Sequence, residues 1–138
     1  MTDVDSSGVL AILLREADGK AVFRAIESSE SLLAPALLPY EVLSGLHAAE
    51  RQKRIDAAAV SNCLHRLTAM PWAFDAHGTD ARLSEASRLS RAHGLSPYGG
   101  AYLELALRHR CTLVSLDASL RKSARAEHLD VLPKTVPA

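Results

Sequence analysis

Two aspartates follow predicted β-strands in this sequence, at positions where a parallel sheet commonly binds its ligand. Asp5 ends the short segment 2–5, and Asp117 follows the apolar run Thr112 to Leu116, the clearest strand pattern in the chain. Ligands of such sheets bind outside the carboxyl ends of the strands. Each aspartate could simply cap the helix that comes next. Two of them on strands of one sheet favour a shared acidic site.

A third acid, Glu41, is expected in the first turn of a helix. Its neighbours Pro39-Tyr40 and Val42-Leu43 are apolar. The helix dipole favours an acid in this turn, and that alone is a sufficient reason for its presence. The apolar neighbours nevertheless leave room for a side chain that faces the protein and joins the two aspartates.

The elements that position these acids alternate between strands and helices. Apolar residues at helical spacing predict the helices, with Gly94 as a helix end and Ser96-Pro97 as the next helix start. Ser6 or Ser7 is the predicted cap of the first helix. The expected strands are 2–5, 31–34, 71–74, 112–116 and one around 131–132, and the expected helices are 7–14, 21–28, 38–53, 55–67, 79–93, 96–110 and 118–125. This order predicts one α/β domain over residues 1–138, with a parallel central sheet sandwiched by helices.

Four segments of the chain resemble the PIN domain, and within it the VapC toxins of bacterial toxin–antitoxin pairs. They read V-D-S-S-G-V-L-A-I-L-L-R-E at 4–16, L-L-A-P-A-L-L-P-Y-E-V at 32–42, H-G-L-S-P-Y-G-G-A-Y-L-E-L-A at 93–106 and T-L-V-S-L-D-A-S-L at 112–120. Each segment alone is weak. Together they cover nearly the whole chain in the right order and spacing.

The resemblance implies a nuclease that uses three or four acids to hold Mg²⁺ or Mn²⁺. Carried onto this chain, Asp5 and Asp117 are the principal catalytic and metal ligands, and Glu41 is a ligand or positions the attacking water. Ser6 and Ser115 are expected to donate hydrogen bonds to this site because they adjoin it. The implied protein is a cytoplasmic, magnesium-dependent endoribonuclease toxin of a VapBC-type pair.

The remaining family acid should start the helix after H-G-L-S, in a pattern like S-x-Y-D-A-A-Y. Gly99 stands at that position, so one expected metal ligand is missing. With Ser96 as N-cap, Gly99 is the third helical residue, where an acid could complete a capping box. Gly99 and Gly100 each cost roughly 1 kcal/mol against alanine inside a helix. A single base change converts Asp to Gly, which suggests inactivation of a toxic enzyme, with a natural variant lineage as the alternative.

Two basic clusters could bind RNA phosphates. One comprises Arg51, Lys53 and Arg54, and the other, just after Asp117, comprises Arg121 and Lys122 with Arg125. Solvated helix ends explain them equally well. Tyr98 and Tyr102 have helical spacing, which favours packing over base stacking.

Family members typically dimerise and are inhibited by a small partner protein. The resemblance therefore implies an RNA substrate, a homodimer and a VapB-like antitoxin, and an apolar groove between the early helices would fit the antitoxin. With Gly99 in place, a second hypothesis is a PIN domain that binds RNA or antitoxin without cutting. A remote third is a phosphatase of the haloacid-dehalogenase type, since Asp3-Val4-Asp5-Ser6-Ser7 fits D-x-D-x-[ST], but the chain has no G-D pair.

Composition excludes several other classes. Sixteen basic and sixteen acidic side chains cancel, so any nucleic-acid surface must be a local patch. Cys63 and Cys111 stand alone and no histidines have zinc spacing, which argues against a zinc site and fits a reducing cytosol. The longest apolar run, 32–40, is nine residues with two prolines, so no membrane span is expected.

Overall fold

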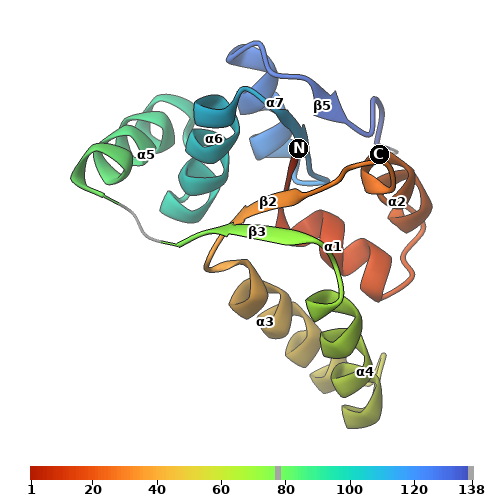
Figure 1. The fold of residues 1–138 in the computed structure, drawn as a ribbon. Coiled ribbons are helices and arrows are strands. Elements are labelled where there is room, and N and C mark those ends of the chain that lie inside the picture. The colour runs from red at the N-terminus through yellow and green to blue at the C-terminus, as the bar shows by residue number, and fades with distance from the viewer. Residues whose placement is uncertain (77–78, 137–138) are drawn as a thin grey trace.

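The computed structural model describes residues 1–76 and 79–136 as short strands that alternate with helices (Figure 1). The predicted helices and strands are all present, with ends that differ by a few residues. In chain order the elements are β1 (Thr2–Val4), α1 (Ser6–Leu13), α2 (Gly19–Ile26), β2 (Leu32–Pro35), α3 (Leu38–Arg51), α4 (Ala57–Thr68), β3 (Trp72–Asp75), α5 (Asp80–His93), α6 (Pro97–His109), β4 (Thr112–Val114), α7 (Ala118–Ala126) and β5 (Val131–Leu132).

The described strands form one sheet in the order β3-β2-β1-β4-β5, and every neighbouring pair is parallel. The central strand β1 places Asp3 opposite Leu33 on one side and Leu113 on the other. Because β1 and β4 run side by side in the same direction, the residues that follow them leave the sheet at the same edge. The prediction of a parallel α/β sheet is confirmed.

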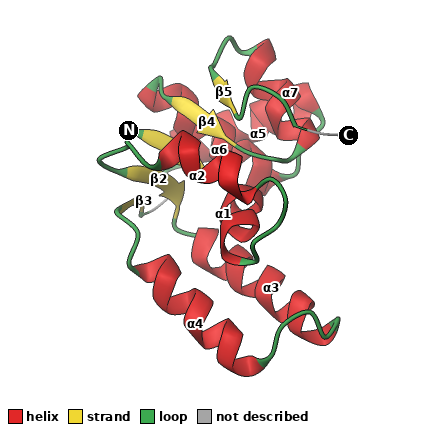
Figure 2. Cartoon of the chain, turned by 90° about the vertical axis from the view of Figure 1, so that its right-hand side faces the viewer, coloured by secondary structure: helices red, strands yellow, loops and turns green. Residues whose placement is uncertain are grey.

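Helices cover both faces of this sheet, as predicted. On one face α6 lies against β1, β2 and β4, with α5 and α7 beside it. On the other face α1 packs against α2 and α3. The α3–α4 hairpin extends away from the sheet, most clearly in the side view (Figure 2).

Helix caps follow the sequence signals with one exception. Ser96 caps α6 by accepting a hydrogen bond from the Gly99 amide, and Gly94 ends α5 with a left-handed φ of 65°. The cap of α1, however, is Asp5, whose carboxylate accepts from the Gly8 amide at 3.0 Å. The prediction that Ser6 or Ser7 caps this helix is therefore wrong.

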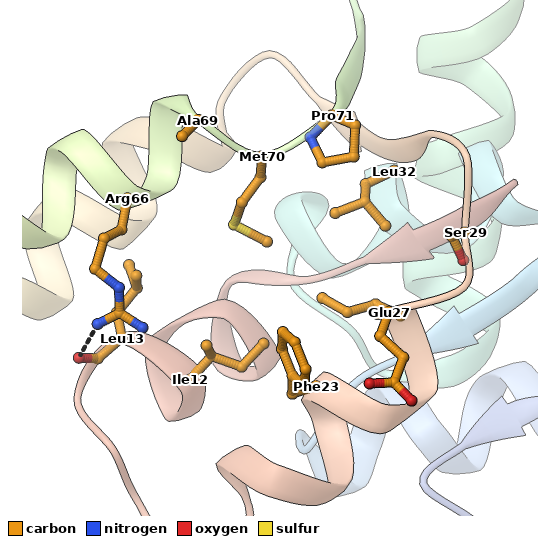
Figure 3. Close-up of a pocket in the computed structure, with 11 residues that line it drawn as sticks. Ile12, Leu13, Phe23, Glu27, Ser29, Leu32, Arg66, Ala69, Met70 and Pro71 are labelled. Atoms are coloured by element: carbon orange, nitrogen blue, oxygen red, sulfur yellow. Dashed lines mark hydrogen bonds between the residues drawn. The ribbon is translucent and has the colours of Figure 1, made fainter.

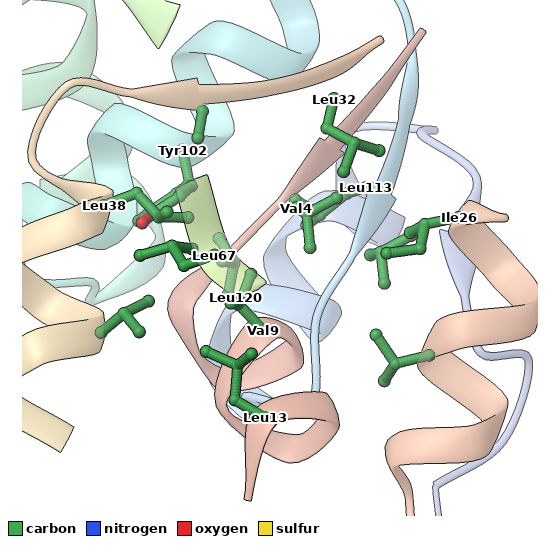
Figure 4. Packing of buried hydrophobic residues seen from close by; sticks show 14 of the residues in the cluster. Val4, Val9, Leu13, Ile26, Leu32, Leu38, Leu67, Tyr102, Leu113 and Leu120 are labelled. Carbon is green, nitrogen blue, oxygen red and sulfur yellow. The ribbon is translucent and has the colours of Figure 1, made fainter. Parts of the chain in front are cut away.

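The core lies between the sheet and the helices on either face (Figure 4). Val4 and Leu113 of the central strands meet Ile26 of α2, while Leu38 of α3 lies near Tyr102 of α6. All five side chains are buried. The packing fixes α3 and α6 relative to the strand ends.

None of the helices in residues 1–76 and 79–136 combines the length and the apolar character needed to cross a lipid bilayer.

Candidate active site at the carboxyl ends of β1 and β4

Asp5 and Asp117 lie at the predicted edge of the sheet. The Asp5 amide continues the strand pairing by donating to the Val114 carbonyl at 3.1 Å. Asp117 caps α7 and accepts from the Leu120 amide at 2.9 Å. Asp5 is only 4% exposed, whereas Asp117 is exposed to solvent. Both aspartates are thus helix caps and, at the same time, neighbours at one end of the sheet.

Two serine hydroxyls connect the segments that carry these aspartates. Ser115 Oγ donates to Asp5 Oδ2 at 2.6 Å and accepts from the Asp117 amide at 3.0 Å. Ser7 Oγ donates to Asp5 Oδ1 at 2.6 Å and accepts from the Leu116 amide at 2.9 Å. Sequence adjacency suggested Ser6 and Ser115. The structure gives this role to Ser7 and Ser115.

The Asp5 carboxyl is held against opposing electrostatic influences. Its burial raises the pKa above the ordinary value, while hydrogen bonds from Ser115, Ser7 and the Gly8 amide lower it. The negative charge of Asp117 raises the pKa further, so the two carboxylates repel each other. A cation between them would relieve that repulsion.

Glu41 approaches the same region from the first turn of α3. Its carboxylate Oε1 accepts a 2.7 Å hydrogen bond from the hydroxyl of Tyr102, which is 2% exposed. Burial raises the pKa of Glu41, the Tyr102 hydrogen bond lowers it, and the charge of Asp5 raises it. Glu41 therefore lies within electrostatic reach of Asp5. Tyr102 packs as predicted, whereas Tyr98 is 59% exposed and does not.

Gly99 lies one turn before Tyr102 in α6. A Cβ at position 99 would meet Leu95 Cβ at 3.4 Å and Ser96 Oγ at 3.7 Å, which are ordinary contacts. The site therefore has space for a side chain that the sequence lacks. A Cβ at Gly100, in contrast, would overlap Ser90 Oγ and the Ala86 carbonyl. Close contact between α5 and α6 explains Gly100, but nothing in the structure explains Gly99.

Asp3 is a buried acid that the sequence interpretation did not place in the site. It is 0% exposed, and neither carboxylate oxygen has a hydrogen-bond partner in the described chain. Burial raises its pKa well above the ordinary value, and the charges of Asp5 and Glu104 add to this. No substrate phosphate can reach such a side chain, so the structure gives no support to Asp3 as a phosphatase nucleophile. The alternation of side chains along β1, which puts Asp3 and Asp5 on one face, was the available signal.

The basic residues separate into three different situations. Arg51, Lys53 and Arg54 are exposed at the tip of the α3–α4 hairpin, about 15 Å along α3 from Glu41. Lys122 is exposed beside Asp117. Arg121 is only 5% exposed and donates to the Ser115 and Pro133 carbonyls. The hairpin cluster is not brought to the acids, and Arg121 already serves backbone oxygens.

The donor set was tested for its fit to a divalent cation. In the part of the chain that the structure describes, no three histidine, cysteine, aspartate or glutamate side chains are grouped closely enough to hold a metal. Asp5 and Asp117 nevertheless supply hard oxygen donors that repel each other. Mg²⁺ is bound by one or two carboxylates and keeps several waters. These residues fit a weakly held Mg²⁺, and they do not form a closed site of three or four carboxylates.

Residues 4–126 match the family model described as the PIN domain. The chain belongs to the PIN-domain family. The predicted membership is thereby confirmed, and the match covers every element from the end of β1 through α7.

Individual PIN-domain relatives agree with this assignment. The chain is 29% identical over 117 residues to Ribonuclease VapC3 of Pyrobaculum aerophilum, covering 85% of this chain and 89% of the relative. A crystal structure of PAE2754 from Pyrobaculum aerophilum matches with a TM-score of 0.68 at 24% identity, over 94% of this chain and 81% of the other. FitAcB from Neisseria gonorrhoeae matches with a TM-score of 0.63 at 17% identity, over 95% and 96%. The two solved structures establish the PIN fold, and the VapC3 relative supports the toxin-type nuclease branch.

Proposed function

We propose that this PIN domain is a cytoplasmic, Mg²⁺-dependent endoribonuclease toxin of a VapBC-type pair, and that Gly99 weakens its activity. The observation that carries the proposal is the approach of Asp5 and Asp117 at the ends of β1 and β4, linked through Ser115. The VapC3 relative, a ribonuclease by name, supports RNA as the substrate.

Asp5 and Asp117 would hold the cation, which supplies a lowered pKa for a bound water and charge neutralisation at the phosphate. Ser7 and Ser115 fix the orientation of the Asp5 carboxylate, so its position does not depend on the metal. Tyr102 occupies Oε1 of Glu41 and leaves Oε2 to orient the attacking water. The raised pKa of Glu41 suits it to accept a proton from that water near neutral pH.

Gly99 removes an acid from this arrangement. A carboxylate three residues before Tyr102 would extend from the same face of α6. Without it the site keeps fewer charged donors for the cation, so affinity for Mg²⁺ and the rate of cleavage should both be low. The space around position 99 means that the acid can be restored without displacing its neighbours.

The test is cleavage of RNA by the native chain, by Gly99→Asp and by Gly99→Asn. The asparagine variant is the matched control, because it has nearly the same size but no charge. We expect Gly99→Asp to cut RNA faster than both other proteins, and to require Mg²⁺ or Mn²⁺. Equal rates for Gly99→Asp and Gly99→Asn would reject a ligand role for position 99. RNA binding without cleavage by any of the three would instead favour the non-cutting binding module.

An apolar pocket between α1, α2 and α4 is our proposed site for the antitoxin. It has a volume of about 420 Å³, and its walls include Ile12, Phe23 and Met70 (Figure 3). Phe23 is 52% exposed. Arg66 at one end donates to the Leu13 carbonyl, and Glu27 lies at the other end. An amphipathic helix with apolar residues on one face and charges at its borders matches this pattern.

Phe23→Glu tests the antitoxin proposal, because the side chain is exposed and its replacement should not unfold the chain. We expect it to abolish binding of the small partner encoded beside this chain's gene. Leu83→Glu on α5, 61% exposed, is the matched control and should bind normally. Equal binding by both variants would place the partner elsewhere.

We also propose a homodimer formed through the β3 edge of the sheet. On this edge strand, Phe74 is 42% exposed and stacks on Trp72 with ring centroids 5.3 Å apart. An exposed apolar edge strand readily pairs with another chain. Analytical ultracentrifugation should show a dimer that Phe74→Lys converts to a monomer, and an unchanged mass for that variant would reject this edge.

A further inference from the structure

A basic cleft lies beside Asp117, between α7 and the segment that follows β5. Its volume is about 630 Å³, and Leu116 and Ala118, the two neighbours of Asp117 in the chain, form part of its wall. Four cationic side chains line it: Arg121, Lys122, Arg125 and Lys134. No aspartate or glutamate is among its lining residues in the described chain.

Two of these cations build the cleft and two are left to bind. Arg121 donates to the Pro133 carbonyl at 2.6 Å, and Arg125 donates to the Lys134 carbonyl at 2.9 Å, so both hold the C-terminal segment against α7. Lys122 and Lys134 are exposed on the two sides. Within residues 1–76 and 79–136, neither ammonium group has a hydrogen bond or ion pair.

The positive charges in the cleft repel one another. Burial lowers the pKa of Arg121, and the charge of Arg125 lowers it further, while Asp5 acts in the opposite direction. The influence of Asp5 also shows that the cleft lies within electrostatic reach of the candidate active site. An anion in the cleft would reduce this repulsion, and it would do so next to the acids that face the scissile phosphate.

We propose that this cleft binds a backbone phosphate of the RNA strand, next to the phosphate that is cut. The inference rests on the proposed nuclease function and adds to it a positioning site made by Lys122 and Lys134. A cleft with four cations and no aromatic wall suits phosphate rather than bases, so the contact carries no sequence preference. Its purpose is to hold the strand in register with Asp5 and Asp117.

The test measures binding of a short fluorescent single-stranded RNA in EDTA, by anisotropy, over a range of salt concentrations. The variant is the pair Lys122→Gln and Lys134→Gln, which keeps long side chains and removes two charges. The matched control is the pair Arg15→Gln and Arg91→Gln, which removes two exposed cations from other parts of the surface. Each lost phosphate contact lowers the slope of log affinity against log salt by about 0.7 for a single strand, hence by about 1.4 for the pair.

We expect weaker binding and the smaller slope only for the lysine pair, with recovery in Lys122→Arg and Lys134→Arg. In cleavage assays with Mg²⁺ the glutamine pair should raise KM and leave kcat unchanged. The proposal is overturned if the glutamine pair binds RNA like the control. If that happens while the native chain still cuts RNA, the cleft alone is refuted. A native chain that neither binds nor cuts RNA would refute the nuclease function as well.

Discussion

The hydroxyl of Tyr102 donates a 2.7 Å hydrogen bond to Oε1 of Glu41, across a separation of 61 residues. This contact joins α6 to α3 at the candidate active site. It also fixes one oxygen of Glu41 in a half-buried environment, where the carboxyl would otherwise be free to rotate. Glu41 is therefore positioned by a neutral donor, in the absence of a charged one.

Tyr102→Phe removes this donor and leaves the packing of the ring in place. Because the hydrogen bond lowers the pKa of Glu41, its loss should raise that pKa further. The carboxyl titration of Glu41, followed by NMR, checks this. Tyr40→Phe is the control, since Tyr40 precedes Glu41 in the chain but is 76% exposed. An unchanged Glu41 titration in Tyr102→Phe would show that the contact does not act on the carboxylate.

Ser115→Ala should disturb Asp5 and Asp117 together. The Asp5 carboxylate loses a 2.6 Å donor and the Asp117 amide loses its acceptor. Leaving buried polar groups unpaired costs about 1–3 kcal/mol, so the free energy of unfolding should fall by that amount. The pKa of Asp5 should rise at the same time. Ser119→Ala, an exposed serine of α7, is the comparison, and equal stability of the two variants would contradict the bridging role.

Asp3 makes stability depend on pH in a defined direction. Its pKa is raised in the folded protein, so the folded chain keeps a proton that the unfolded chain releases above about pH 4. The free energy of unfolding is therefore highest below that pH, and it falls as pH rises through the folded pKa. Asp3→Asn cannot ionise and should flatten this fall in urea titrations performed without metal. Asp5 and Glu41, whose pKa values are also raised, leave a smaller residual slope. An Asn variant with the same slope as the native chain would show that Asp3 does not hold the proton.

The two glycines of α6 should respond to alanine in opposite ways. Gly99→Ala adds a methyl group in ordinary contact distance and should stabilise the fold by up to about 1 kcal/mol through helix propensity. Gly100→Ala forces overlap with Ser90 and the Ala86 carbonyl and should cost about 1–3 kcal/mol. Chemical denaturation of both variants decides the matter. Destabilisation by Gly99→Ala would mean that position 99 is as constrained as position 100.

The features predicted from the sequence were those that local patterns determine. Apolar periodicity and capping residues located the helices, and alternation of strands with helices placed Asp5 and Asp117 at one edge of a parallel sheet. Even the error at the first cap was local, because an aspartate and two serines in a row all fit the cap preference.

The features that were not predicted depend on contacts between distant segments. Tyr102 and Glu41 meet only because α3 and α6 converge at the strand ends. Arg121 looked like a solvent-facing phosphate ligand, yet the chain after β5 folds back over it and takes up its donors. Asp3 required the register of a three-residue strand to show that it is sealed beneath α6. No periodicity in the sequence encodes these relations.

Mn²⁺ binding by the native chain and by Asp117→Asn, measured by calorimetry, tests the central claim most directly. Asparagine keeps the helix cap, so the variant should fold and lose only the charge. We expect its affinity to fall by at least tenfold, the lower end of the roughly 10–100-fold loss seen when a mere supporting residue of a metal site is removed. Equal affinity in the two proteins would mean that Asp5 and Asp117 do not share a cation, and the proposed catalytic site would be wrong.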